Sequence, residues 1–240
     1  SKTKKNVHFT AIPISMDGSG TIAQYYEDEI LIDTIKIPLI GIHNLSNVLG
    51  SIAICRESGL EFDELKDILK KIQLPKRRFE FKGIWQGKQI IDDYAHHPTE
   101  IKATIAMARL IMNYEKIVTA KPQKRLIIVF QPHRYSRTKD LMKEFAESFA
   151  ESDIICLLPI YSAGESPISG INSESLSVLI KNKNPNISID LARNYKHLKD
   201  ILSTVSFDND IILFIGAGDI NKFSEKLLIE SNSNFKEFPA

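Results

Sequence analysis

The sequence has few cysteines, almost no net charge and no long apolar run. Its two cysteines, Cys55 and Cys156, lie about a hundred positions apart without metal-ligand spacing. Both fall in apolar surroundings, so we expect buried free thiols in a reducing compartment. No segment approaches the roughly 20 apolar residues of a membrane-spanning helix. The charged start, residues 1–5, is not followed by the apolar stretch of a secretory signal. The expected location is therefore the cytoplasm.

The charge balance and the missing motifs narrow the possible partners. Lysine and arginine total 31, and aspartate and glutamate total 30, which gives a formal net charge of +1. Neither nucleic acid nor a membrane surface is favoured as a partner by this balance. The sequence contains no Gly-x-x-x-x-Gly-Lys-Ser/Thr phosphate-binding loop and no His-x-x-x-His or Cys-x-x-Cys pair. We therefore predict no metal site, and the oligomeric state stays open.

Apolar runs alternate with helical patterns in the larger, later part of the chain. A hairpin is predicted from Glu80 to Trp85 and from Lys88 to Asp93, around Gln86-Gly87. Short continuous apolar runs separated by helices are typical of a parallel sheet covered on both faces. The runs are 126–130, 154–158, 187–189 and 211–215, and the helices 101–108, 136–150, 173–181, 195–204 and 220–231. The predicted fold class is α/β, with a Rossmann-like, mostly parallel sheet between helices, and the tail from residue 231 is expected to fray.

The earlier part of the chain has a different pattern. Three strands are predicted at 8–13, 21–26 and 29–37, followed by helices at 44–58 and 61–72. Asn44 is a candidate cap for the first helix, and Gly59 is a candidate stop. Pro75 and the basic run after it interrupt both helical periodicities, so we expect a domain boundary between about residues 74 and 79.

The most informative segment is 92–100, Asp-Asp-Tyr-Ala-His-His-Pro-Thr-Glu. It follows an apolar strand and precedes a helix, so its titratable groups lie where open α/β sheets bind their ligands. A loop that only caps the helix is the alternative interpretation. Capping needs one oxygen, whereas this loop brings together two acids, a phenol and two imidazoles, and a binding or catalytic site is therefore favoured.

Four other segments complete a recognisable order along the chain. They are 41–47 (Gly-Ile-His-Asn-Leu-Ser-Asn), 130–138 (Phe-Gln-Pro-His-Arg-Tyr-Ser-Arg-Thr), 161–168 (Tyr-Ser-Ala-Gly-Glu-Ser-Pro-Ile) and 216–220 (Gly-Ala-Gly-Asp-Ile). Together with 92–100, they resemble the Mur ligases, and among these the branch that joins L-alanine to UDP-N-acetylmuramate. The resemblance implies an ATP-dependent ligase of peptidoglycan synthesis that works through an acyl phosphate. ATP, L-alanine and UDP-N-acetylmuramate are the implied small-molecule partners, with Mg²⁺ accompanying ATP.

The resemblance also implies a domain organisation. Residues 1–75 correspond to the last part of the family's central ATP-binding domain, and 77–240 to its C-terminal domain. The phosphate-binding loop, most Mg²⁺ ligands and the UDP-binding domain would precede these residues in the family. The 240 residues alone are therefore expected to be inactive, and the 1–75 segment is expected to expose an apolar face.

Roles are carried over position by position. The implied ATP contacts are His43, Asn47, Arg78 and Asp93; the implied substrate contacts are Tyr94, His133, Arg134, Arg137 and Ala217; and the implied catalytic residues are His96, His97, Arg134 and Arg137. Independently of the resemblance, two guanidinium groups three residues apart can hold a carboxylate or phosphate, and a neutral imidazole can position an amine. Residues four apart, such as His43 and Asn47, share a helix face.

Alternatives remain for these residues and for the chain as a whole. The arginines of 134–137 could be solvated surface groups, Arg78 could be a linker charge, and one of the two adjacent histidines could be a packed core residue. The chain could be a non-catalytic nucleotide- or amino-acid-binding module. It could also resemble the ligase that reattaches a recycled tripeptide, which shares the Asp-Asp-aromatic-Ala-His-His-Pro motif. That ligase has a Pro-Arg-Ser-Asn type sequence where residues 133–137 read His-Arg-Tyr-Ser-Arg.

Overall fold

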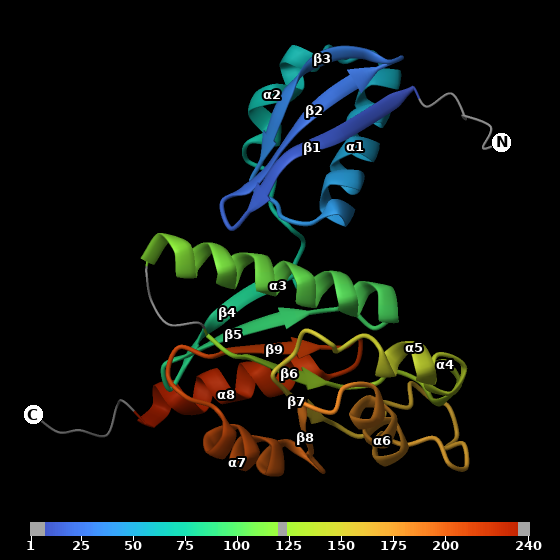
Figure 1. Cartoon of the computed structure of the whole chain (residues 1–240), viewed down its shortest axis with the longest axis vertical. Helices are drawn as coiled ribbons and strands as arrows, with labels where there is room; N and C mark the ends of the chain where they lie inside the picture. Colours follow the sequence, from blue (N-terminus) through green and yellow to red (C-terminus); the bar gives the residue numbers. More distant parts are fainter. Residues whose placement is uncertain (1–7, 120–123, 235–240) are drawn as a thin grey trace, which may run out of the picture. The chain divides into compact units, whose positions relative to one another are not determined.

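The computed structural model describes residues 8–119 and 124–234, which separate into two compact units (Figure 1). The first unit contains the described residues up to Leu74 together with those from Leu110 to the end of the first range. The second runs from Pro75 to Arg109 and continues from residue 124. Within the described ranges, no helix has the length and apolar content of a membrane span.

The first unit is an antiparallel sheet with two helices packed on one face (Figure 1). Alternate residues of the strands, such as Tyr25 and Ile35, point to this face because side chains alternate along a strand. The Tyr25 ring stacks on Phe62 with centroids 4.8 Å apart. The elements are β1 (Phe9–Asp17), β2 (Gly20–Glu27), β3 (Ile30–Ile37), α1 (Ile42–Glu57) and α2 (Phe62–Leu69).

The ends of α1 confirm one prediction and correct another. The helix ends at Ser58, and Gly59 follows with φ 90°, as predicted for a glycine stop. The cap at the start is Gly41, with φ 105°, and not Asn44. Asn44 lies inside the helix, where its buried amide donates to the Ile40 carbonyl at 2.7 Å. The prediction of an Asn44 cap was wrong because the left-handed glycine starts the helix earlier.

The other face of this sheet carries the apolar surface that we expected to be exposed. Ile12, Ile14 and Leu31 are 49%, 59% and 50% exposed.

The two cysteines differ in burial. Cys156 is buried, as expected, while Cys55 is only half-buried, contrary to expectation. Burial raises the pKa of the Cys156 thiol to about 12, so it stays protonated.

The second unit is a six-stranded sheet in the order β4-β5-β9-β6-β7-β8. Only β4 runs antiparallel, as the first strand of the predicted hairpin. The strands are β4 (Glu80–Trp85), β5 (Lys88–Asp93), β6 (Leu126–Phe130), β7 (Ile154–Leu157), β8 (Ser188–Leu191) and β9 (Ile211–Ile215). The predicted α/β class and mostly parallel sheet are confirmed.

Helices cover both faces of this sheet (Figure 1). Ile127 and Val129 of β6 pack with side chains of two helices, α7 and α8. Phe130 points to the opposite face, where its ring lies 5.6 Å from that of Phe145 and 5.2 Å from that of Phe149. The helices are α3 (Pro98–Thr119), α4 (Tyr135–Asp140), α5 (Met142–Ala146), α6 (Ser173–Lys183), α7 (Tyr195–Val205) and α8 (Ile220–Asn234).

Several predicted bounds differ from the structure, for example β1, which continues to Asp17, and α2, which ends at Leu69, and three differences are larger. The single helix predicted at 136–150 is two short helices, because Leu141 leaves the helical conformation with φ −113°. The helix predicted at 101–108 continues to Thr119. The predicted frayed tail is helical up to Asn234, and its last six residues lie outside the described ranges.

Candidate functional site

The carboxyl ends of β5, β9 and β6 lie next to one another, and their following loops form the candidate site. Backbone hydrogen bonds join the loops: Gly216 N donates to the Asp93 carbonyl, and Gln131 N to the Ile215 carbonyl, both at 3.1 Å. A parallel bridge then joins His133 to Tyr161. Asp93, Gly216, His133 and Tyr161 are therefore gathered at one end of the sheet.

Asp92 forms a buried ion pair with Arg77, a residue to which the sequence assigned no role. The Asp92 side chain is wholly buried, and its Oδ2 lies 3.0 Å from Arg77 Nε. Arg77 Nη2 also donates to the Gly216 carbonyl at 2.7 Å, and the guanidinium lies 5.0 Å from the Tyr94 ring centroid. Burial raises the pKa of Asp92, and the Arg77 charge partly opposes this shift. Arg77 thus ties the ends of β5 and β9 together.

The Asp93 carboxylate is hydrogen-bonded by neighbouring backbone N–H groups. Its carboxylate accepts hydrogen bonds from Phe79 N at 2.8 Å and from Ala95 N at 2.7 Å. Burial raises its pKa, and these backbone hydrogen bonds oppose the rise. The neighbouring Arg78 is exposed and adds a favourable charge interaction. The Thr104 side chain is a third donor to this carboxylate, which has about four lone-pair positions, so Asp93 keeps limited capacity for a ligand hydroxyl.

His96 is held by the loop that precedes α3. Its Nδ1 lies 3.0 Å from the Tyr94 carbonyl and 3.4 Å from Glu100 Oε2. Glu100 also accepts from the backbone N–H groups of His96 and His97, at 3.0 and 3.1 Å. A carboxylate at this position is favourable because the first helical turn exposes unpaired N–H groups. His96 is half-buried, whereas His97 and Tyr94 are exposed.

His133 lies at the centre of an aromatic and cationic cluster. Its ring stacks on Tyr161 at 5.4 Å and meets the His96 ring edge-on at 6.2 Å. Arg137 Nη1 lies 3.2 Å from His133 Nδ1. Burial lowers the pKa of His133, and the charge of Arg137 lowers it further. The imidazole is therefore neutral near pH 7.

Arg134 lies at the start of α4 in a conformation that is rare outside glycine, with φ 74°. Its guanidinium is half exposed and lies 3.7 Å from Glu165 Oε1. Glu165 also accepts hydrogen bonds from Ser136, and these lower its pKa. No role was predicted for Glu165, although it belongs to the segment 161–168.

The turn after β9 packs closely against this cluster. A Cβ added at Gly218 would lie 2.5 Å from Gln131 Oε1 and 2.8 Å from Tyr161 Cγ, so only glycine fits there. Gln131 Nε2 donates to Asp219 Oδ1 at 3.0 Å. Ala217, between the two glycines of the turn, is half-buried. The turn therefore packs directly against the Tyr161 ring.

His43 and Asn47 lie in the first unit, one helical turn apart near the start of α1, and both are exposed. The His43 ring folds back over Gly41, where an added Cβ would lie 2.7 Å from ring atom Cε1. Their assignment to the nucleotide stays a prediction.

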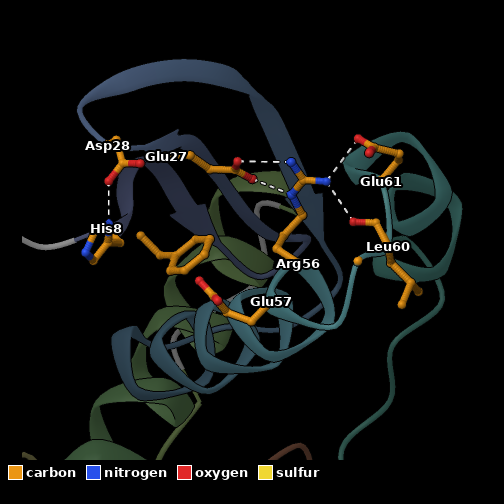
Figure 2. Close-up of a pocket in the computed structure, with 9 residues that line it drawn as sticks. His8, Glu27, Asp28, Arg56, Glu57, Leu60 and Glu61 are labelled. Atoms are coloured by element: carbon orange, nitrogen blue, oxygen red, sulfur yellow. Dashed lines mark hydrogen bonds and ion pairs between the residues drawn. The ribbon is translucent and has the colours of Figure 1, made fainter.

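A cavity of about 330 Å³ lies at the opposite end of α1 (Figure 2). Arg56 occupies its wall and bonds both carboxylate oxygens of Glu27, at 2.7 and 3.1 Å, as well as Glu61 (Figure 2). His43 is thirteen residues away along the helix, about 20 Å at 1.5 Å per residue. None of the predicted site residues lines this cavity.

A smaller cavity, of about 210 Å³, lies in the second unit at the carboxyl ends of β7 and β8. Tyr135 forms part of its wall, so it adjoins the site through the residue between Arg134 and Ser136. The described residues contain no group of three or more His, Cys, Asp or Glu side chains that could hold a metal.

These features define the class of protein domain. It is an α/β domain in which imidazole and guanidinium groups lie together at the carboxyl ends of parallel strands. The family model described as "Mur ligase, glutamate ligase domain" matches residues 77–218. The chain belongs to the Mur ligase family.

Named relatives give a finer comparison. A UDP-N-acetylmuramate–L-alanine ligase of Prochlorococcus marinus is 49% identical over 223 residues, which cover 93% of this chain and 47% of that protein. Its counterpart from Parasynechococcus marenigrum is 42% identical over 215 residues, or 90% of this chain and 46% of that protein. The chain thus spans about half the length of the curated relatives it matches.

Solved structures show the same fold. The crystal structure of UDP-N-acetylmuramate–alanine ligase from Thermotoga maritima matches with a TM-score of 0.75 at 22% identity, over 97% of this chain and 47% of that one. A murein peptide ligase from Psychrobacter arcticus matches with a TM-score of 0.65 at 21% identity, over 97% and 45%. A MurF ligase from Thermotoga maritima, solved with ADP, matches with 0.59 at 17% identity, over 92% and 47%.

Proposed function

We propose that this chain acts in the ATP-dependent ligation of L-alanine to UDP-N-acetylmuramate in peptidoglycan synthesis. The observation that carries the proposal is the cluster of His96, His133, Arg134 and Arg137 at one sheet edge. The relatives named for this reaction, at 42–49% identity, support it. The proposal also locates the protein in the cytoplasm, where ATP is available.

The proposed chemistry joins an amine to an activated carboxylate. ATP supplies the phosphoryl group that converts the lactyl carboxylate of UDP-N-acetylmuramate to an acyl phosphate. Arg134 and Arg137 are proposed to hold the alanine carboxylate and neighbouring phosphate charge, since a guanidinium pairs with both. His96 and His97 are proposed to act on the amine and Tyr94, His133 and Ala217 to line the substrate. Charge develops on oxygen as the carbonyl is attacked, so nearby cations and N–H donors lower the barrier.

The residues fit an adenosine ligand in part. Asp93 and Arg78 are proposed to contact ribose and phosphate, and the remaining acceptor capacity of Asp93 suits a ribose hydroxyl. His43 and Asn47 are proposed for the adenine edge. The described residues do not fit Mg²⁺ by themselves, since they offer no cluster of metal-binding side chains. Mg²⁺ is proposed only as the companion of the ATP phosphates.

The test uses the longest open reading frame that contains this sequence. Phosphate release is measured with ATP and UDP-N-acetylmuramate, and with L-alanine, glycine or the recycled tripeptide as the amine, with mass spectrometry of the product. We expect turnover with L-alanine above both alternatives. Preference for the tripeptide would assign the recycling reaction, and nucleotide binding without product would assign a binding module.

A further inference from the structure

The hydrogen-bond partners of His96 fix which of its nitrogens can accept a proton. His96 Nδ1 lies 3.0 Å from the Tyr94 carbonyl. A carbonyl oxygen only accepts hydrogen bonds, so Nδ1 must carry the hydrogen. Glu100 Oε2, at 3.4 Å from the same nitrogen, favours this arrangement as well. In the neutral ring, Nε2 is therefore left with its lone pair, which is the form that a general base requires.

His133 is held in the opposite tautomer. Its Nδ1 lies 3.2 Å from Arg137 Nη1. A guanidinium has only donors and stays protonated, so Nδ1 must accept. The hydrogen of the neutral His133 ring is therefore on Nε2, and this nitrogen can only donate. The two imidazoles, with ring centroids 6.2 Å apart, thus carry their hydrogens on different nitrogens.

His97 does not share the arrangement of His96. Its Nδ1 faces the backbone N–H of Thr99 at 3.4 Å, which makes Nδ1 an acceptor and leaves the hydrogen on Nε2. The His97 ring is also exposed. Of the two adjacent histidines, only His96 is a half-buried residue whose Nε2 can accept a proton.

We infer that His96 Nε2 accepts the proton of the incoming amino acid's ammonium group, while His133 Nε2–H donates to a substrate oxygen. The inference rests on the proposed function and deepens it. The amine nitrogen forms a bond to the acyl carbon, and the carbon–oxygen bond to phosphate breaks, with its electron pair leaving on phosphate. The ammonium loses two protons in the reaction. One goes to His96 and then to solvent, and the other to the departing phosphate.

The surroundings of His96 suit a proton acceptor. Glu100 approaches from α3 and stabilises the charged ring, whereas Tyr94 contacts the ring edge-on at 5.4 Å. His133 faces it from the loop after β6, and its neutrality removes a repulsion that a second charged ring would bring. Arg137 contacts His133 Nδ1 and brings a positive charge to the cluster, which opposes the favourable effect of Glu100 on a charged His96 ring.

The first experiment reads the tautomers directly. Long-range ¹H–¹⁵N NMR spectra of the histidine-labelled chain are recorded at alkaline pH, where the imidazoles are neutral, and assigned with single His→Gln variants. We expect His96 with its hydrogen on Nδ1 and His133 with its hydrogen on Nε2. A His96 hydrogen on Nε2, or a His133 hydrogen on Nδ1, overturns the inference without any reference to activity.

The second experiment uses the active ligase that contains this chain. His96→Gln is expected to lower kcat by about 10²–10⁴-fold, the usual contribution of acid–base catalysis, with a smaller change in KM for L-alanine. The substitution should also remove the decrease of kcat/KM at acidic pH. His8→Gln, on an exposed histidine of the first unit, is the matched control and should leave both parameters unchanged.

The outcomes separate the inference from the proposed function. A wild-type ligase that makes no alanine product overturns both. If the wild-type ligase makes the product and the His96→Gln variant keeps the same kcat and the same acidic limb of the pH profile, only the proton-acceptor role is overturned.

Discussion

Glu165 accepts hydrogen bonds from both the backbone N–H and the hydroxyl of Ser136, at 2.9 and 2.7 Å. The two residues are 29 positions apart, so a distant loop supplies the cap that α4 lacks from its own sequence. The same carboxylate lies beside Arg134. Glu165 therefore fixes the turn that presents the two arginines of the site.

Replacing Glu165 should destabilise the start of α4. We expect wild type to be more stable than Glu165→Gln, and Glu165→Ala to be the least stable, because glutamine keeps one acceptor oxygen. The hydrogen bonds with Ser136 lower the pKa of Glu165, so its contribution to stability is present above the unfolded value of about 4.3 and disappears as pH falls through the lower folded value. Chemical denaturation between pH 3 and 7 measures this.

The control for that series is Glu151→Ala, on an exposed side chain at another loop. Its curve should overlay wild type throughout. Equal stability of wild type and Glu165→Ala at pH 7 would show that the cap contributes nothing.

Removing either arginine of the site should weaken substrate binding in the active ligase. Arg134→Ala and Arg137→Ala are expected to raise KM for L-alanine or UDP-N-acetylmuramate, since losing one partner of a buried charge contact commonly costs about 2–5 kcal/mol. Lys139→Ala, an exposed charge on the same helix, is the control. Unchanged kinetics in both arginine variants would show that these residues are solvated surface groups without a role in substrate binding.

Removing Arg77 should leave Asp92 as a buried charge without a partner. Breaking such a pair costs about 3–5 kcal/mol, so Arg77→Met is expected to lower the free energy of unfolding by that order. The double variant Arg77→Met/Asp92→Asn should recover part of the loss. Arg78→Met, at the exposed neighbour, should change stability little. A similar loss in both single arginine variants would contradict the ion-pair interpretation.

Asp92 should also give stability a characteristic pH dependence. Burial raises its folded pKa, so the folded protein holds the Asp92 proton more tightly than the unfolded chain does. This contribution is complete below the unfolded value of about 3.9 and is lost as pH rises through the folded value. Relative to wild type, Asp92→Asn should therefore gain stability as pH rises from about 3.5 to 6.5, measured by urea unfolding. A slope of the opposite sign would show that Arg77 outweighs burial.

Gly218 should not tolerate a side chain. Its added Cβ would lie 2.8 Å from Tyr161 Cγ, so Gly218→Ala must displace the ring that stacks on His133. Overpacking of this kind costs about 1–3 kcal/mol. Gly50→Ala is the matched control, because nothing lies within 4 Å of its added Cβ and it sits within α1. That variant should be more stable than wild type by about 0.5–1 kcal/mol.

The sequence predicted that the segments of the candidate site lie together, because the strands are continuous apolar runs and parallel strands end at the same end of the sheet. It singled out Arg78 by resemblance and assigned no role to Arg77, because the backbone turn that directs the Arg77 side chain has no local sequence signal. Arg77 has φ 59°, and this turn sends its side chain to Asp92 while Arg78 stays exposed.

Other errors arose from contacts between distant residues. Residues 136–150 have helical composition throughout, but the helix is interrupted at Leu141, and Phe145 and Phe149 beyond the break pack on Phe130. Glu165 gave no local signal because its partner lies 29 positions earlier. Contacts of this kind follow from the fold and not from the neighbouring residues.

The central position of β9 makes the candidate site form late in folding. This strand lies between β5 and β6, yet it is the last strand of the chain. Before residues 211–215 leave the ribosome, the hairpin that carries His96 and the strands that lead to His133 have no shared hydrogen bonds across this gap. Inserting β9 joins two half-sheets, so the two imidazoles become neighbours only when nearly the whole domain has been synthesised.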